Sequence, residues 1–416
     1  MSTIKEFQFS SNHQFLRSLL CWADHHYTYT GFFDHNDIEY PYGGFQRVLM
    51  AAHQGFDLEI ANQWFGKKEM AAILSYDYKN NIEKLKSNNR SLVDCPESIF
   101  FIPEIKIEIL VDHVRIYHAD PQSIFDEICA LNQNHLKNPS IEISALTSRN
   151  NYFENVKDIQ NNIVEGDMYE LNYCLGFEFE SKNWNPIEGF FDLMGKSPMP
   201  FSAFFKAESK YLICASPERF LKKTGDKLIA QPIKGTIKRG KNELEDSLLK
   251  EKLLNSEKER AENLMIVDLM RNDLSRISQT GSVKVEELFG VYPFSRVHQM
   301  ISTVVSTISE KKSLMEILHA TFPMGSMTGA PKIKCMELID QYEDFKRGWF
   351  SGALGYIDET GNFDLCVVIR SIILDKESGK GYFAVGSAIT YDADAAYEYE
   401  ECLLKASAIV EVLQGN

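Results

Sequence analysis

The spacing of apolar residues separates strand-like from helical segments along the chain. The stretch "SIFFIPEIKIEILV" (98–111) has the short β-branched runs typical of strands. The segment "SYDYKNNIEKL" (75–85) predicts the end of a strand that enters a helix. Residues 152–179 predict an amphipathic helix, a turn at Gly166-Asp167 and then a strand.

The rest of the chain continues this mixture without an internal repeat. We expect paired strands at 210–223 and 226–240, a long helical segment at 245–277, a strand at 296–308, helices at 313–323, 333–343 and 395–413, and a three-stranded meander at 352–391. Strands and helices do not alternate as βαβ units, so the pattern predicts an α+β fold with antiparallel sheets. The sequence changes character near Asn151, and we expect two domains, residues 1–145 and 146–416.

Charge and cysteine content exclude several classes of function. The 416 residues include 44 basic and 59 acidic side chains, a net charge of -15, which argues against broad binding to nucleic acid or an anionic membrane. An anionic substrate would therefore need a local group of cations. Eight cysteines without a CxxC pair indicate reduced thiols. With no signal-peptide pattern and no 18-residue apolar run, we expect a cytoplasmic protein without a membrane span.

The stretch "AQPIKGTIKRG" (230–240) contains a residue that its turn does not require. Pro232, Gly235 and Thr236 are typical of a tight turn whose backbone amides are available to an anion. Lys234, a bulky cation, lies between them. Loop lysines are mostly solvated, so composition alone leaves Lys234 as either a surface side chain or a residue with a chemical role.

Two pairs of glutamates have the spacing of one helical face. Glu259 and Glu262 are three residues apart in one expected helix, and Glu398 and Glu401 are three apart in the last. Two such faces brought together could hold Mg²⁺, which accepts one or two protein carboxylates together with waters and substrate oxygens. The alternative is that both faces are simply solvated.

Two further features could serve an anion. The glycine-rich turn "GSMTGAPK" (325–332) precedes a helix and offers backbone amides and the Thr328 hydroxyl, although it matches neither the P-loop nor the dinucleotide fingerprint. Arg370 interrupts the apolar run "CVVIRSII" (366–373), where a charge must be paired or face a polar cavity. A structural salt bridge and an anion ligand both satisfy that requirement.

Four motifs together identify a family that the chain resembles. "ASPERF" (215–220), "ENLMIVDLMRNDLSRI" (262–277), "FPMGSMTGAPK" (322–332) and "CVVIRS" (366–371) occur in the order found in the chorismate-utilising enzymes, and the resemblance runs from about Tyr152 to the C-terminus. The resemblance implies two large antiparallel β-sheets packed together and flanked by helices, with the active site between them. Within the family, "PIKGT" is typical of aminodeoxychorismate synthases, in which the lysine is a nucleophile, whereas anthranilate synthases have "PIAGT".

The resemblance also implies roles for individual residues. It implies that the catalytic residues are Lys234 as nucleophile, Glu218 as general acid, and His298 near the reacting ring. It implies Mg²⁺ as cofactor on Glu262 and Glu401, with Glu259 and Glu398 close by. The substrate contacts that we expect are Gly235, Thr236, Thr328, Arg370, Gly386, Ser387, Ala388 and Lys405.

Some positions depart from the family pattern. Glu170, in "GDMYELNYC", stands where amino-transferring members usually have glutamine and isochorismate-type members have lysine. Ala388 replaces a usual glycine, and Phe350 replaces a tyrosine of anthranilate synthases. The chain also lacks the "LLES" motif of tryptophan-inhibited anthranilate synthases.

The implied substrates are chorismate and ammonia, and the implied product is 4-amino-4-deoxychorismate on the route to 4-aminobenzoate and folate. No cysteine lies in a "GxCxGxQ" turn, so we expect ammonia from a separate glutamine amidotransferase subunit. The alternatives are an anthranilate synthase subunit and, more remotely, a catalytically inactive binding subunit with the same fold.

Overall fold

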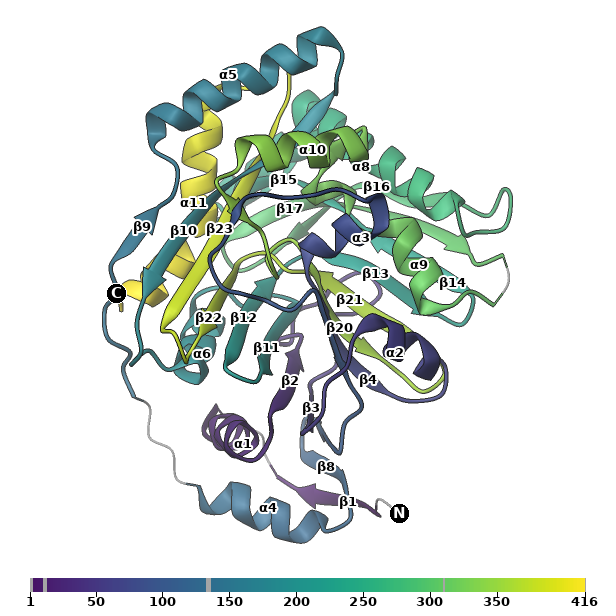
Figure 1. The fold of residues 1–416 in the computed structure, drawn as a ribbon, viewed down its shortest axis with the longest axis vertical. Coiled ribbons are helices and arrows are strands. Elements are labelled where there is room, and N and C mark those ends of the chain that lie inside the picture. Colours follow the sequence, from purple (N-terminus) through teal and green to yellow (C-terminus); the bar gives the residue numbers. More distant parts are fainter. Residues whose placement is uncertain (1–2, 10–12, 132–135, 310, 416) are drawn as a thin grey trace.

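A computed structural model describes residues 3–9, 13–131, 136–309 and 311–415, and two large antiparallel sheets face each other in it with helices around them (Figure 1). In this part of the chain the larger sheet has twelve strands in the order β1-β8-β7-β3-β2-β11-β12-β22-β23-β10-β18, with β9 paired to β10. Their bounds are β1 Thr3–Gln8, β2 Tyr29–Asp34, β3 Val48–Ala52, β7 Ile105–Ile109, β8 His113–His118, β9 Ile143–Ala145, β10 Glu170–Glu180, β11 Phe201–Ala207, β12 Lys210–Ser216, β18 Gly329–Ala330, β22 Ser371–Asp375 and β23 Lys380–Ile389.

The second sheet has nine strands among the described residues, in the order β15-β17-β14-β13-β21-β20-β4-β6, with β16 paired to β17. Their bounds are β4 Met70–Leu74, β6 Ser98–Phe101, β13 Arg219–Thr224, β14 Lys227–Gln231, β15 Ile233–Lys238, β16 Lys284–Pro293, β17 Val297–Thr307, β20 Ala353–Ile357 and β21 Phe363–Val367. A short parallel pair is formed by β5 Arg90–Ser91 and β19 Phe345–Lys346. The predicted α+β class with two large antiparallel sheets is confirmed.

Helices cover the outer surfaces of the two sheets (Figure 1). In the larger sheet, α11 packs on β23 and α6 on β12, whereas in the second sheet α8 packs on β17 and β15 and α2 on β6. The helices are α1 His13–His26, α2 Leu58–Trp64, α3 Lys79–Glu83, α4 Pro121–Ala130, α5 Arg149–Glu165, α6 Pro186–Lys196, α7 Glu243–Leu254, α8 Glu257–Ser275, α9 Leu314–Thr321, α10 Lys332–Tyr342 and α11 Ala395–Gln414, with 3₁₀ turns η1 Tyr76–Tyr78 and η2 Gly325–Met327. No helix in the described ranges is long and apolar enough to cross a membrane.

Burial along the strands follows from their place in the sandwich. β7 ("IKIEI") alternates buried and half-buried side chains, as a strand with one face on the core does. β10 is buried along almost its whole length because it lies inside the sheet with α10 packed against it. Aromatic side chains of the two sheets meet in the core: the rings of Phe33 and Tyr356 lie 5.3 Å apart, and those of Phe101 and Phe205 lie 5.9 Å apart.

The N-terminal 145 residues contribute strands to both sheets. β2 pairs with β11 in the larger sheet, and β4 pairs with β20 in the second. The first residues of the chain that are described, Thr3–Gln8, form the edge strand β1 against β8. The division at residue 145 stays a sequence-based prediction, and the strands on its two sides share two continuous sheets.

Two segment predictions were wrong in detail. The long helical segment 245–277 is two helices, because the Ser256 hydroxyl accepts a hydrogen bond from the Glu259 amide and starts α8 afresh after α7 has ended. The expected meander at 352–391 is four strands in two sheets: β20 and β21 lie in the second sheet, and β22 and β23 lie in the larger one. The chain changes sheet at Val368–Arg370, where Arg370 has a left-handed φ of +50°.

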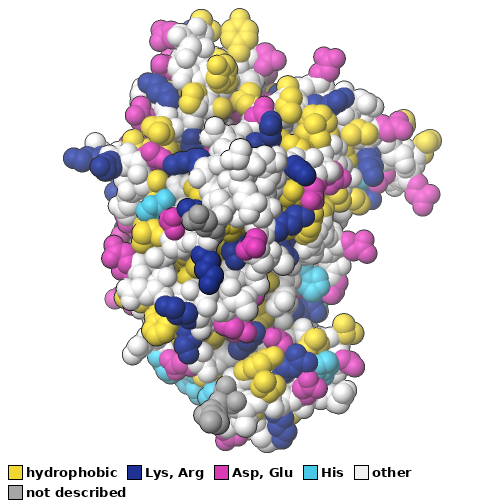
Figure 2. Space-filling view, turned by 90° about the vertical axis from the view of Figure 1, so that its right-hand side faces the viewer, with side chains coloured by type: hydrophobic (Ala, Val, Ile, Leu, Met, Phe, Trp, Pro, Cys, Tyr) yellow, Lys and Arg dark blue, Asp and Glu magenta, His cyan; other side chains and the backbone are white. Residues whose placement is uncertain are grey.

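Surface charge is mixed on the face that Figure 2 shows. Lysine and arginine side chains alternate with aspartate and glutamate across that face, and they do not gather into a basic stripe there.

Candidate active site

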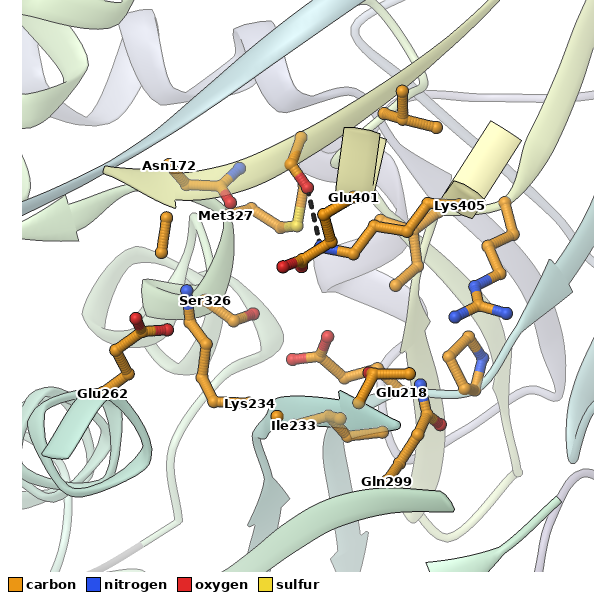
Figure 3. A pocket seen from close by; sticks show the side chains of 18 of the residues that line it. Asn172, Glu218, Ile233, Lys234, Glu262, Gln299, Ser326, Met327, Glu401 and Lys405 are labelled. Atoms are coloured by element: carbon orange, nitrogen blue, oxygen red, sulfur yellow. Dashed lines mark hydrogen bonds and ion pairs between the residues drawn. The ribbon is translucent and has the colours of Figure 1, made fainter. Parts of the chain in front are cut away.

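A cavity of about 110 Å³ lies between the two sheets, beside α8 and α11 (Figure 3). The larger sheet contributes side chains from β10 and β23, and the second sheet contributes them from β15 and β17. The cavity is lined by Asn172, Pro217, Glu218, Ile233, Lys234, Gly235, Thr236, Lys258, Glu259, Glu262, Gln299, Ser326, Met327, Phe350, Ile369, Arg370, Ala384, Val385, Gly386, Ala388, Glu398, Glu401 and Lys405.

Lys234 lies on β15, and its amino group points into the cavity between Glu262 and Ser326 (Figure 3). The Nζ atom donates a 2.7 Å hydrogen bond to Oε1 of Glu170, which is fully buried at the start of β10. Burial alone would lower the pKa of Lys234, but the carboxylates of Glu170, Glu262 and Glu218 outweigh it and hold the pKa above its ordinary value. Lys234 is therefore a charged, paired lysine that lines a cavity, and the solvated alternative is wrong.

Glu218 lies in the short connection between β12 and β13, with its carboxyl group in the cavity near Ser326 (Figure 3). Burial raises the pKa of Glu218 to about 7, although the charges of Lys234 and Lys405 act in the opposite direction. A carboxyl group with such a pKa is partly protonated at neutral pH, which is the state that a general acid requires.

Glu218 and Arg370 occupy equivalent places in the topology. β12 and β13 lie in different sheets, and so do β21 and β22, so each residue lies where the chain passes from one sheet to the other. Arg370 has no ion pair or side-chain hydrogen bond within the described residues, and burial lowers its pKa to about 10. Arg370 is half-buried in the cavity wall, and a partly desolvated guanidinium without a partner is costly. Of the two alternatives for Arg370, the structural salt bridge is not formed in the part of the chain described, so its guanidinium in the cavity wall is available to an anion.

The four glutamates expected at a metal lie together on one side of the cavity. Glu259 and Glu262 project from α8, and Glu398 and Glu401 project from α11. Burial raises the pKa of Glu262 to about 7 and also raises that of Glu398. Glu262 and Glu398 are buried and Glu259 and Glu401 are half-buried, so the alternative of two fully solvated helix faces does not hold.

Lysines already compensate part of this negative charge. Lys258 Nζ lies 2.8 Å from Oε1 of Glu398 and 3.7 Å from Oε1 of Glu262. Lys405 Nζ lies 2.7 Å from Oε1 of Glu401 and donates a 2.9 Å hydrogen bond to the Gly386 carbonyl. These contacts tie the C-terminal helix α11 to both α8 and β23.

The carboxylates fit the donor preference of Mg²⁺, although they do not form a finished ligand shell. Glu262 Oε1 is buried and accepts no hydrogen bond, so it retains a free lone pair for a cation. Among the described residues, no three histidine, cysteine, aspartate or glutamate side chains are grouped as a ready metal site. Mg²⁺ bound by one or two carboxylates, with waters and substrate oxygens completing its shell, is compatible with both observations.

Glycines let the backbone approach the cavity closely. Gly235 has φ +92°, and a Cβ there would lie 3.0 Å from Glu259 Oε2. At Gly386 a Cβ would lie 2.6 Å from the Cys174 sulfur. These two predicted substrate contacts line the cavity, as do Thr236, Ala388, Arg370 and Lys405.

Three predicted site residues do not line the cavity. The Thr328 hydroxyl donates hydrogen bonds to the carbonyls of Met324 and Gly325 in its own turn. The Ser387 hydroxyl contacts Tyr152 Oη at 3.2 Å, on the opposite face of β23 from Gly386 and Ala388. His298 Nε2 lies 2.9 Å from Asp246 Oδ1, whereas its strand neighbour Gln299 lines the cavity.

Sequence reasoning missed several lining residues, of which Lys258 is the most informative. Lys258 lies one helical turn before Glu262, and this i,i+4 spacing was a signal that Lys258 shares the helical face of Glu262. Ser326 and Met327 lie in the same glycine-rich turn as Thr328, and the turn conformation selects which of them faces inward. Asn172 follows Glu170 by two positions on β10.

Comparison with known proteins gives consistent results. The chain is 39% identical over 352 residues to aminodeoxychorismate synthase component 1 of Klebsiella aerogenes, covering 82% of this chain and 76% of that protein. It is 39% identical over 269 residues to the protein of the same name from Escherichia coli (strain K12), covering 64% of this chain but only 58% of the relative's length.

A solved structure and a family match extend the similarity. The crystal structure of anthranilate synthase component I from Streptococcus pneumoniae TIGR4 superimposes with a TM-score of 0.77 and 25% identity, covering 92% of each chain. The family described as chorismate binding enzyme matches residues 27–411, which include every residue that lines the cavity. The chain belongs to the chorismate binding enzyme family.

Proposed function

We propose that the protein is an aminodeoxychorismate synthase component I that converts chorismate and ammonia into 4-amino-4-deoxychorismate through a bond to Lys234. The observation that carries the proposal is that the Lys234 amino group and the Glu218 carboxyl group face one cavity between the sheets. Relatives that bear this name, at 39% identity, support it.

Cations in the cavity fit a substrate with two carboxylates. Arg370 has no partner within the described residues and offers a planar fork that can bind one carboxylate in a bidentate manner. Lys405 and the backbone at Gly235–Thr236 line the same space. Together with the proposed Mg²⁺, which would offset the glutamates of the cavity, these cations would answer the requirement set by a net charge of -15.

Lys234 and Glu218 would act in one step. The Lys234 amine attacks C2 of the ring, the ring double bond shifts, and the C4–O bond breaks as Glu218 donates its proton, so that the hydroxyl leaves as water. Ammonia then forms a bond to C4, the double bond shifts back, and the C2–N bond breaks to release Lys234, while the new ammonium group at C4 returns a proton to Glu218. Because Lys234 is protonated in the cavity, it has to lose a proton before the first step.

Mg²⁺ is the cofactor that we propose, held by Glu262 and Glu401 with Glu259 and Glu398 close by. When bound, it would neutralise the negative charge of a substrate carboxylate. The chain's own residues would orient the ring between the two sheets.

Ammonia is proposed to come from a separate glutamine amidotransferase. The name "component 1" of the relatives is in keeping with a second component. The most distinct alternative is an anthranilate synthase subunit, favoured by the structural match to the Streptococcus pneumoniae protein. Lys234 argues against it, because that branch of the family has alanine at this position.

The test is incubation with chorismate and Mg²⁺, with either an ammonium salt at high pH or glutamine as nitrogen source. We expect 4-amino-4-deoxychorismate, identified by its mass and ring-substitution pattern, from ammonium alone. Anthranilate as the main product would favour the alternative. Amination from glutamine by the isolated chain would disprove the separate amidotransferase.

A further inference from the structure

Glu170 is a buried carboxylate directly behind Lys234. It lies at the start of β10, it is fully buried, and its Oε1 accepts the 2.7 Å hydrogen bond from Lys234 Nζ. Its second oxygen, Oε2, is buried and has no hydrogen-bond partner. Such an oxygen is costly in a protein interior, so its retention calls for a reason.

The position of Glu170 is fixed from several directions. Its backbone pairs with Ala330 of β18, and its carbonyl accepts a hydrogen bond from the Cys335 thiol on α10. The carboxylate is therefore presented to Lys234 by a rigid strand edge. Lys234 is held on β15 of the opposite sheet, and its side chain is 10% exposed.

We propose that Glu170 is the base that takes the proton from the Lys234 ammonium when the amine attacks the substrate, an inference that rests on the proposed function. The N–H bond of the ammonium breaks, its proton forms an O–H bond on Glu170, and the nitrogen lone pair becomes available for the bond to C2. When the C2–N bond later breaks, Lys234 leaves as a neutral amine and takes the proton back from Glu170. The exchange is internal and balanced, so it consumes no other reactant.

The other charged groups that face Lys234 are unsuited to this task. Glu218, from the connection between the sheets, has to keep its proton for the departing hydroxyl. The Glu262 carboxylate, on α8, attracts the Lys234 ammonium through space but forms no hydrogen bond with it. Lys405, from α11, is a cation and cannot accept a proton. Glu170 is the carboxylate in hydrogen-bond contact, and geometry decides among bases.

A carboxamide at this position could accept the same hydrogen bond but not the proton. The substitution Glu170→Gln, which hardly changes the shape of the side chain, therefore separates two roles of Glu170: accepting the hydrogen bond of Lys234 and accepting its proton. In the variant, the proton of Lys234 has to leave to solvent. The rate of attack then depends on bulk pH in a way that the wild-type rate does not.

The experiment measures amination at a fixed concentration of free ammonia, with saturating Mg²⁺, from pH 6.5 to pH 9. At pH 7 we expect Glu170→Gln to be at least about 100-fold slower than wild type, as for loss of a general base. The ratio of the wild-type rate to the Glu170→Gln rate should fall by about tenfold for each unit that the pH rises. Glu170→Asp should be slower than wild type but keep a pH-independent ratio, because it still carries an acceptor.

Asp273→Asn is the matched control. Asp273 is a buried carboxylate paired to Lys332, and neither residue lines the cavity. This variant should lose stability without changing the pH profile. A rate for Glu170→Gln within about threefold of wild type overturns the proposal, and so does an equal loss at every pH, which would mark a packing role.

A second measurement does not depend on turnover. Acetic anhydride labels neutral amines, and the mass of the peptide that bears Lys234 reports its modification at each pH. The Glu170→Gln variant should be labelled at lower pH than wild type, by at least about one unit, because Lys234 loses the partner that holds its proton. Its slower amination then comes from the missing proton acceptor during the attack and not from a shortage of neutral amine. Coincident curves overturn the proposal. Absence of 4-amino product from wild type, by contrast, disproves the proposed function, whatever the labelling shows.

Discussion

Arg370 combines two features that proteins rarely tolerate together. It has a left-handed backbone conformation, and its guanidinium has no anionic partner in the described part of the chain. Both features are concentrated at the point where the chain passes from β21 to β22. A residue kept in such a place is more easily explained by a ligand than by stability.

Arg370→Lys should therefore impair substrate binding. A lysine keeps the positive charge but loses the two parallel N–H donors of the fork. We expect KM for chorismate to rise by about tenfold or more, since hydrogen bonds to charged groups are worth about 1.5–3 kcal/mol. Arg271→Lys is the control, because Arg271 is exposed on α8 and pairs with Asp268. An unchanged KM in the Arg370 variant would remove it from the substrate site.

Glu218 makes the folded protein sensitive to pH. Burial raises its pKa from 4.5 to about 7, so the folded state binds more protons than the unfolded state between these values. The contribution of Glu218 to stability is fully present below about pH 4.5 and is lost as pH rises toward 7. Glu218→Gln should remove this slope, an effect of roughly 3 kcal/mol at most.

Chemical unfolding in chelator at pH 5 and pH 8 measures this prediction. Wild type should lose more stability than Glu218→Gln over that range. A parallel loss in both proteins would show that Glu218 is ionised in the folded state. The same variant should also lose turnover, because a carboxamide cannot donate the proton to the departing hydroxyl.

At the scale of elements, the strand β15 carries Lys234 on a backbone that only glycine permits. Gly235 follows Lys234 with φ +92°, and a Cβ there would press on Glu259 of α8. Gly225 offers a matched comparison, because it has φ +58° but no atom within 4 Å of the place that a Cβ would take. Both glycines thus have a left-handed backbone, but only at Gly235 would an added Cβ meet a neighbouring side chain.

Gly235→Ala and Gly225→Ala should each destabilise the fold by roughly 1 kcal/mol through backbone strain. Only Gly235→Ala should also slow amination, by about tenfold or more, because the added methyl group displaces Glu259 and the lysine beside it. Thermal unfolding and kcat measured on the same samples separate the two effects. Equal activity of the two variants would show that β15 tolerates the shift.

Helices α8 and α11 are joined by the ion pair of Lys258 and Glu398, and the proposed metal site lies beside that ion pair. Glu262→Gln or Glu401→Gln should reduce turnover at least about 100-fold with the fold intact, because each removes an anionic oxygen from a site for a hard cation. Glu400→Gln, an exposed neighbour on α11 that pairs with Arg149, is the control. Undiminished activity of wild type in excess chelator would eliminate the metal.

At the scale of the whole molecule, an acidic protein encloses a group of cations. The chain has a net charge of -15, whereas four cations, Lys234, Lys258, Lys405 and Arg370, line one internal cavity beside its glutamates. The cavity lies between the two sheets, and the chain passes from one sheet to the other beside Glu218 and again at Arg370. The fold thereby brings Glu218, Lys234 and Arg370 to one cavity from distant parts of the sequence.

The sequence predicted the sheet class and most lining residues, and its failures have physical causes. Motifs fix which segments approach the site, but strand pleating decides which side chain faces it: Gln299 lines the cavity and His298 does not. At Arg370 the chain passes from one sheet to the other within an apolar run, and this passage leaves no periodic signal in the sequence. The partner of Lys234 was also hidden, because Glu170 is 64 residues away in sequence.

The central claim is that Lys234 bonds to the substrate, and the rate of 4-amino-4-deoxychorismate formation by Lys234→Ala tests it most directly. Lys238→Ala, at the exposed end of the same strand, is the control and should behave as wild type. We predict that Lys234→Ala loses several orders of magnitude in this rate, with at most traces of a 2-amino isomer or anthranilate, because the covalent route is closed. Formation of the 4-amino product at near wild-type rate would contradict the account and make Lys234 a bystander.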